Sequence, residues 1–81
     1  MRRSSSAVTS SISKLIDAVM DGYVGWREES VAVDAAYREW VRAASAWRAL
    51  AFEDYCAALD REERAASEYQ RLLAIAQSAT A

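Results

Sequence analysis

An all-α fold is predicted by three features of this 81-residue sequence. Alanine, the strongest helix former, supplies 18 residues, and leucine, arginine and glutamate are also frequent. There is no proline, and the two glycines lie together at positions 22 and 25, so the turn residues that separate the strands of a β-rich domain are missing. Apolar side chains recur in steps of three and four, which is the spacing of one face of a helix. The chain is long enough for one domain with a small core.

The first helix is predicted over residues 7–21, after a flexible arm at residues 1–6. Its apolar stripe comprises Val8, Ile12, Leu15, Ile16, Val19, Met20 and Tyr23. Gly22 and Gly25 indicate the end of this helix, because glycine commonly adopts the left-handed conformation just past a helix. As an alternative, two glycines three residues apart mark a close-packing position inside one continuous helix.

A second helix is predicted over residues 28–45. Apolar residues repeat here in alternating steps of four and three, as in a coiled coil: Val33, Tyr37, Trp40, Ala44 and Trp47. Asp34, Arg38 and Arg42 follow one another in steps of four on a different face, which we expect to be solvated.

The spacing of the apolar residues then changes. If the same steps continued from Trp47, the apolar stripe would include Asp54, which is charged. A new stripe appears instead: Phe52, Tyr55, Leu59, Ala66, Tyr69, Leu73 and Ala76. A turn or kink near Ser45, with Ser45 as the N-cap, explains this change. A stutter within one long helix would give the same pattern. The third helix is predicted over residues 46–77, on the order of 45–50 Å long, and residues 78–81 are expected to fray.

No catalytic, cofactor or metal site is predicted. The chain has no histidine, which removes most zinc sites and imidazole catalysis, and no glycine-rich phosphate loop. Cys56 is the single cysteine and is expected to be a small buried hydrophobe. Glu62 is the one polar residue at a core position of its heptad, between Leu59 and Ala66. We interpret it as a polar residue at the end of the core or as a partner for an arginine at an interface.

The charge pattern carries little information about partners. The net charge is −2, which argues against nucleic-acid binding over the whole surface. One lysine against nine arginines indicates a GC-rich coding sequence, typical of many bacteria. Polar residues interrupt the N-terminal apolar stripe, so neither a signal peptide nor a membrane span is predicted, and we expect a cytoplasmic protein. The Arg- and Ser-rich start also fits an organellar transit peptide.

A helical bundle completed by dimerisation is the expected architecture. The third helix is longer than either of its predicted partners, so part of its apolar stripe would stay uncovered in a monomer. Trp and Tyr dominate interface hot spots. For Trp40 and Trp47, burial in the intramolecular core and burial at an interface are both expected from the helical spacing, and contact with nucleic acid is a third alternative. The interface residues we predict are Tyr37, Trp40, Trp47, Phe52, Tyr55, Leu59, Glu62, Tyr69 and Leu73.

The function predicted is therefore that of a non-enzymatic, self-associating interaction or adaptor module, with a homodimer partner or another protein. A second hypothesis is a small nucleic-acid-associated regulator, in which the Arg2–Arg3 arm and Arg38, Arg42 and Arg48 contact phosphates. The third is a small all-α dimeric enzyme, which requires a cleft where arginines converge with Glu62.

Overall fold

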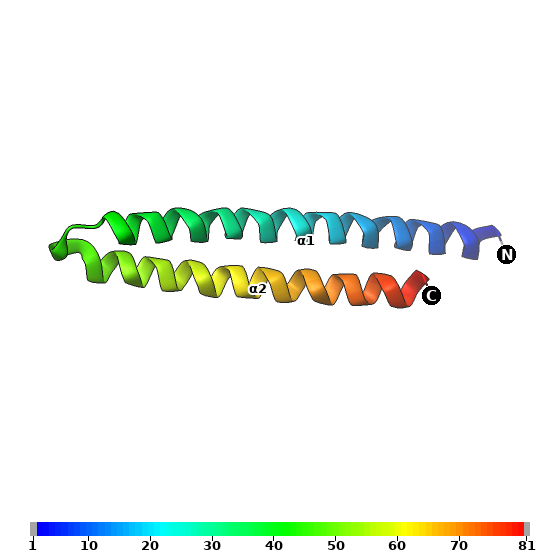
Figure 1. Ribbon diagram of the computed structural model, residues 1–81. Helices are drawn as coiled ribbons and strands as arrows, with labels where there is room; N and C mark the ends of the chain where they lie inside the picture. The colour runs from blue at the N-terminus through cyan, green and yellow to red at the C-terminus, as the bar shows by residue number, and fades with distance from the viewer. Residues whose placement is uncertain (1, 81) are drawn as a thin grey trace.

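The protein is a helical hairpin. The computed structural model describes the backbone of residues 2–80 and the side chains of residues 9–80. Helix α1 (Arg2–Arg42) and helix α2 (Arg48–Thr80) run antiparallel and are joined through a short 3-10 helix, η1 (Ser45–Trp47) (Figure 1). The hairpin measures 68 × 14 × 13 Å between its outermost Cα atoms. The described residues form no strand, so the predicted all-α fold with a long C-terminal helix is confirmed.

One continuous seam joins the two helices. On each helix the seam follows alternating steps of three and four residues, the pattern of a coiled coil, and each of its members is buried or half-buried. Ala58 is the one fully buried residue in the described part of the chain. The seam comprises Ile12, Leu15, Val19, Gly22, Trp26, Glu29, Val33, Ala36 and Trp40 of α1, Ala43 just after α1, and Ala51, Tyr55, Ala58, Glu62, Ala65, Tyr69, Leu72 and Ala76 of α2.

The predicted end of the first helix at Gly22 and Gly25 is wrong, because α1 continues through both residues. Neither glycine has a positive φ angle. The close-packing alternative is correct for Gly22: a Cβ there would lie 3.1 Å from Cδ1 of Leu72 and 3.7 Å from Cα of Tyr69. The missing side chain lets α2 approach α1 beside a large ring, so the glycine serves helix packing rather than helix termination.

The break near Ser45 is confirmed, but Ser45 is not the N-cap of α2. Ala44 has the extended conformation that interrupts the helix, with φ −65° and ψ 157°, and no side chain caps η1. The backbone N–H of Trp47 donates to the carbonyl of Ala44 at 2.9 Å. Arg48 reaches back and donates from Nη2 to the carbonyl of Ala43 at 3.3 Å. A basic side chain therefore satisfies one of the free carbonyls at the end of α1.

The helices extend further than predicted at both chain ends. Residues 2–6, expected as an arm, continue α1 as helical backbone, and Met1 lies outside the described residues. At the other end, residues 78–80 are helical rather than frayed, and Thr80 Oγ1 donates to the carbonyl of Ala76 at 3.0 Å. Ala81 lies outside the described residues. Helix α1 has 41 residues and α2 has 33, so α1 covers α2 along its whole length.

Valine substitution at the two glycines should separate packing from helix propensity. Gly22→Val should destabilise the hairpin by about 1–3 kcal/mol, because the added methyl groups push against Leu72 and the backbone of Tyr69. A Cβ at Gly25 would meet no atom within 4 Å, so Gly25→Val is the matched control. Chemical unfolding at one fixed protein concentration measures both. Equal effects at the two positions would contradict the packing role of Gly22.

Candidate functional site

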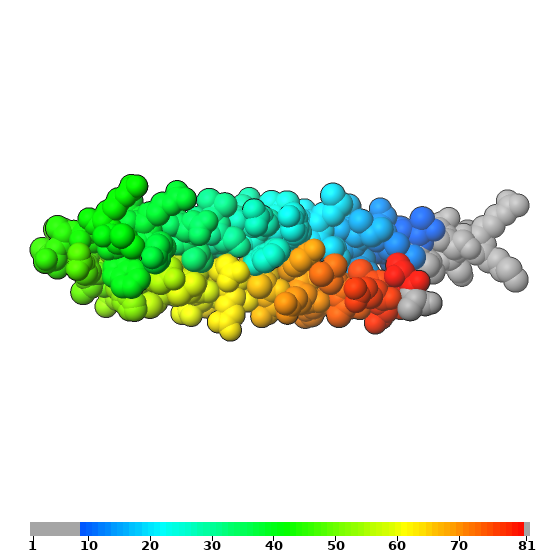
Figure 2. Space-filling model, viewed as in Figure 1, coloured from blue at the N-terminus to red at the C-terminus, as the bar shows by residue number. Residues whose placement is uncertain are grey.

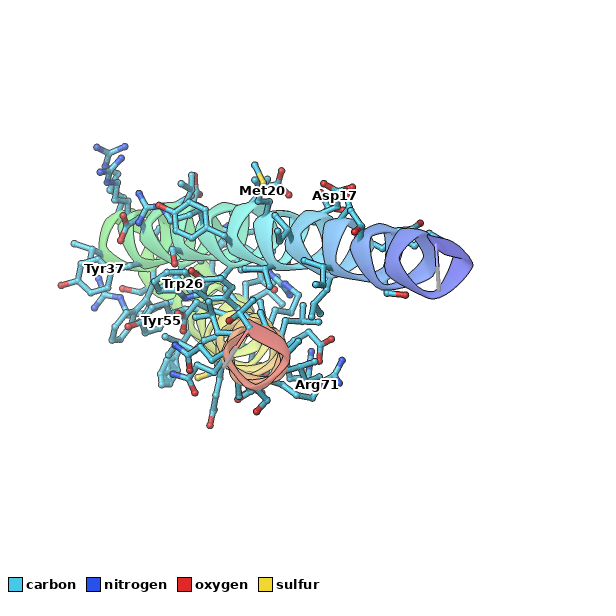
Figure 3. The ribbon with its side chains drawn as sticks, turned by 90° about the vertical axis from the view of Figure 1, so that its right-hand side faces the viewer. Asp17, Met20, Trp26, Tyr37, Tyr55 and Arg71 are labelled. Atoms are coloured by element: carbon cyan, nitrogen blue, oxygen red, sulfur yellow. The ribbon has the colours of Figure 1, made fainter. Side chains whose placement is uncertain are left out.

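The hairpin has two open sides that flank the seam, and they differ in chemistry. The residues next to the seam on one side are mostly large and apolar. Phe52 is 40% exposed and Leu59 is 37% exposed. We call this surface the apolar side; it comprises Ile16, Tyr23 and Tyr37 of α1 and Phe52, Leu59, Ala66 and Leu73 of α2. Figure 3 shows Tyr37, Trp26 and Tyr55 on one side of the hairpin and Arg71 on the opposite side. The space-filling view shows the two helices in contact along the length of the hairpin (Figure 2).

Two aromatic clusters lie on the apolar side and reach into the seam. In the first, Trp26 stacks on Tyr69 at a centroid distance of 5.8 Å and an angle of 13°, and Tyr23 lies 5.7 Å from Tyr69. The first cluster thus joins α1 to α2 through ring contacts.

The second cluster repeats this arrangement near the turn. Trp40 stacks on Tyr55 at 5.5 Å and 15°, and Tyr37 lies 5.7 Å from Tyr55. Phe52 adds a further ring, 4.9 Å from that of Trp40. Aromatic pairs of this kind contribute beyond the area they bury.

The two clusters are related by a repeat in the sequence. Tyr23 and Trp26 recur 14 residues later as Tyr37 and Trp40, which is two heptads or about 21 Å along a helix. On α2 the corresponding tyrosines are Tyr69 and Tyr55, again 14 residues apart. The twofold occurrence of Tyr-x-x-Trp is the signal in the sequence that could have identified Trp26, for which no role was predicted.

Glu62 lies in the seam, between the two clusters. Its Oε1 accepts a hydrogen bond from Nε1 of Trp26 at 2.7 Å. No arginine among the described residues pairs with Glu62; the neighbouring Arg61 instead contacts Glu29 at 3.4 Å. The carboxylate therefore satisfies the indole N–H of a half-buried tryptophan, which explains a charged residue at a core position of the heptad.

On the opposite side of the hairpin, the α2 residues next to the seam are mostly charged. These residues are Asp54, Arg61, Glu68 and Ile75, and we call this surface the charged side. Arg71 Nη2 lies 2.7 Å from Glu68 Oε1. Hydrogen bonding from Arg71 lowers the pKa of Glu68 below its usual value, and the same contact raises the pKa of Arg71. Both groups are exposed, so this ion pair adds little to stability.

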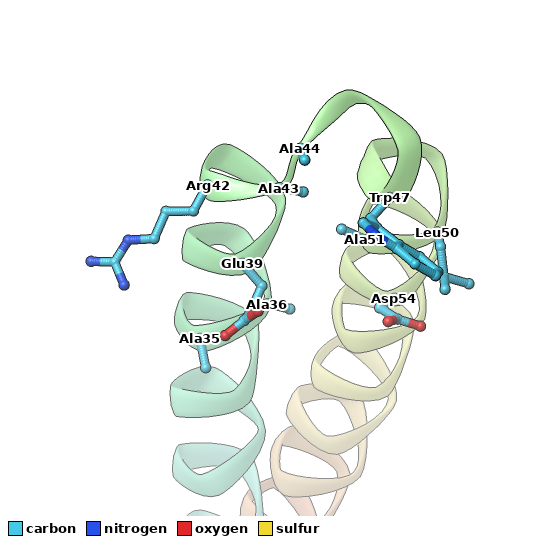
Figure 4. Close-up of a pocket in the computed structure, with 10 residues that line it drawn as sticks. All are labelled: Ala35, Ala36, Glu39, Arg42, Ala43, Ala44, Trp47, Leu50, Ala51 and Asp54. Carbon is cyan, nitrogen blue, oxygen red and sulfur yellow. The ribbon is translucent and has the colours of Figure 1, made fainter.

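Trp47 lies in a different environment from Trp40. The two residues were predicted to share one helical face, but α1 ends at Arg42 and Trp47 follows the turn onto the charged side. Trp47 is 65% exposed. It forms one wall of an open groove of about 570 Å³, which has a floor of alanines and carries Glu39 and Asp54 (Figure 4).

The predicted interface residues therefore divide into three groups. Four lie in the seam: Trp40, Tyr55, Glu62 and Tyr69. Four lie on the apolar side: Tyr37, Phe52, Leu59 and Leu73. Trp47 lies beside the turn on the charged side. The apolar stripe predicted for the third helix mixed seam residues, such as Tyr55 and Tyr69, with residues of the neighbouring row on the apolar side. The two rows were not distinguished because both are rich in apolar residues.

No cluster of metal-binding side chains is found among the described residues, which contain no group of three or more His, Cys, Asp or Glu side chains placed to hold a metal ion. Cys56 is exposed, so its predicted burial is wrong. Arg38 and Arg42 are exposed on α1, while Arg48 donates to the Ala43 carbonyl. Neither helix, over its described residues, contains a segment long and apolar enough to cross a bilayer.

Comparisons with known proteins identify no relative. The sequence matches no protein-family model, and searches of curated proteins and of solved structures give no significant match. The geometry of the hairpin is therefore the basis for a functional proposal.

The Trp26–Glu62 hydrogen bond should be measurable by a double-mutant cycle. Trp26→Phe combined with Glu62→Ala should give a coupling free energy of about 1.5 kcal/mol, because a charged acceptor strengthens the bond. Glu62→Gln should lose less than Glu62→Ala, since its amide oxygen still accepts. Glu53→Ala, on the outer surface of α2, is the control. Chemical unfolding gives the four free energies, and a coupling near zero would show that the bond has no role.

The two tryptophans of the turn region should differ sharply in their effect on stability. Trp40→Ala should cost about 3 kcal/mol, because it removes the ring that stacks on Tyr55 and contacts Phe52. Trp47→Ala should cost less than about 1 kcal/mol, as expected for an exposed side chain. Thermal unfolding followed by circular dichroism compares them. Similar losses for both variants would contradict the placement of Trp47 outside the seam.

Proposed function

We propose that the chain is a non-enzymatic interaction module that self-associates through the apolar side of its hairpin. The observation that supports this most directly is the surface area. The hairpin exposes 6366 Å², whereas a compact monomer of 9.0 kDa exposes about 4,850 Å². The excess of roughly 1,500 Å² is larger than the ~800 Å² that each partner buries in an interface of standard size.

The shape of the chain supports the same proposal. Its radius of gyration is 18.8 Å, against about 12 Å for a compact domain of this length. Two helices in contact along one seam leave most large side chains half-exposed, and Ala58 alone is fully buried among the described residues. A contiguous apolar surface of this kind rarely stays open to water in a soluble monomer.

The chemistry of the apolar side suits a helical protein partner. Aromatic residues are enriched at the buried centres of interfaces, where they combine large contact area with few rotatable bonds. Here the rings of Tyr23, Tyr37 and Phe52 are already held by neighbouring rings within the hairpin, so little side-chain freedom remains to be lost on binding. Further helices packed on this side would complete a bundle.

Polar substitution on the two sides of α2 tests this proposal. Leu59 and Ile75 are 37% and 42% exposed and lie on the apolar and charged sides respectively. Leu59→Gln should weaken self-association tenfold or more, because the loss of a buried leucine costs about 1.5–3 kcal/mol. Ile75→Gln is the matched control and should leave association unchanged. Sedimentation equilibrium measures both. A wild-type chain that stays monomeric at high micromolar concentration contradicts the proposal.

A further inference from the structure

We infer that the apolar side is occupied by a second copy of this chain, packed antiparallel with its turn at the opposite end, to form a four-helix bundle. The two-fold axis of this dimer passes between the two aromatic clusters, beside Ser30. This inference rests on the proposed self-association and adds the orientation of the two copies. Its support is the distribution of side chains along both helices of the apolar side.

The aromatic repeat on α1 is the first argument. Tyr23 and Tyr37 lie seven residues on either side of Ser30. A two-fold axis at Ser30 therefore places Tyr23 of one copy opposite Tyr37 of the other, and the first aromatic cluster meets the second. At the axis itself the side chain is small, and the Ser30 hydroxyl already donates to the carbonyl of Trp26 at 3.1 Å. The two helices labelled α1 can thus approach closely without burying an unsatisfied polar group.

On α1, the row of residues beside Tyr23, Ser30 and Tyr37 and farther from the seam gives the second argument. Its two halves are complementary in chemistry about the same axis. This row contains Met20, Arg27, Asp34 and Val41, all exposed. The antiparallel arrangement places Met20 opposite Val41 of the second copy, and Arg27 opposite Asp34 of the second copy. Apolar residues meet apolar residues, and each charge meets the opposite charge. Such pairing favours one register over its neighbours.

Helix α2 gives the same axis independently. Phe52 and Leu73, and also Leu59 and Ala66, are symmetric about a midpoint between residues 62 and 63. An antiparallel copy therefore places Phe52 opposite Leu73 of the second copy, and Leu59 opposite Ala66 of the second copy. A large side chain meets a small one at the second pair, which permits interdigitation.

The midpoint on α1, at Ser30, and the midpoint on α2, between residues 62 and 63, lie at the same height along the hairpin. A single two-fold axis requires this. Trp26 Nε1 contacts Glu62 and Arg61 contacts Glu29, so residues near 30 on α1 face residues near 62 on α2. This packing brings Glu63 of one copy near Glu63 of the second copy. Both side chains are exposed, so solvent screens their repulsion.

The other symmetric packing, with both turns at the same end, fits less well. It places α1 of one copy against α2 of the other at the same level. Met20 then lies opposite Gln70, and Asp34 lies opposite Cys56. The apolar match of Met20 and the charge match of Asp34 are both lost. One charge match is kept, because Arg27 lies opposite Glu63. The antiparallel packing is therefore the one that the side chains favour.

A distance between the two turns separates these packings. A spin label at Ala46→Cys, in a Cys56→Ser background that has been shown to keep its helicity and association, reports the distance by double electron–electron resonance. The antiparallel dimer should give about 45–50 Å, from twice the 16 residues between positions 30 and 46 at 1.5 Å per residue. Turns at the same end should give about 20 Å or less, because packed helices lie 8–10 Å apart.

Each outcome decides a different claim. A dimer with the long distance supports the inference. A dimer with the short distance overturns the antiparallel packing and leaves the proposed self-association intact. A folded monomer at every concentration overturns both.

Charge reversal provides a second test of the register. Arg27→Glu should weaken the dimer several-fold by facing Asp34 of the second copy, and adding Asp34→Arg should restore affinity to within about twofold of wild type. Arg64→Glu, on the outer surface of α2, is the matched control and should have no effect. Sedimentation equilibrium at low salt gives the affinities. A double variant as weak as Arg27→Glu alone would overturn the Arg27–Asp34 pairing.

Discussion

Two helices packed along one seam cannot enclose a core, and the remaining features of this protein depend on that constraint. In this seam nearly every residue contacts the opposite helix and stays partly exposed to solvent. Among the described residues, full burial is reached at one small side chain, Ala58. The large residues instead form two stacked layers, Trp26 on Tyr69 and Trp40 on Tyr55. Flat rings suit this geometry, because they cover a wide strip of the seam at each level.

The spacing of those layers links the intramolecular packing to the proposed assembly. Small residues occupy seam positions beside the rings, and Gly22 allows a close approach next to Tyr69. Glu62 lies in the seam between the two layers and accepts the hydrogen bond from Trp26. The same two-heptad interval that fixes the layers also spaces the exposed tyrosines on the apolar side. One periodicity thus organises both the hairpin and the surface offered to a second copy.

The sequence was informative about helix formation and less so about helix continuity. Its all-α character and the break near Ser45 followed from composition and spacing. The continuity of α1 did not, because a glycine pair is compatible with a helix end and with close packing, and only the approach of Leu72 distinguishes them. The register of α2 was half correct, since Tyr55 and Tyr69 lie in the seam while Phe52 and Leu73 lie beside it. When two adjacent rows of a helix are both apolar, the sequence of that helix does not show which row packs against the other helix. The predicted excess length of the C-terminal helix is absent, because α1 covers the full length of α2; the apolar side of the hairpin stays exposed instead.

We propose that the hairpin reaches its stable form when a second copy covers its apolar side. The most direct test is the dependence of the unfolding midpoint on protein concentration. Because dissociation and unfolding are linked in such a dimer, a hundredfold increase in concentration should raise the midpoint by roughly 5–10 °C. A midpoint that stays constant over that range, with native helicity retained, would show that the isolated hairpin is stable alone and would contradict the account.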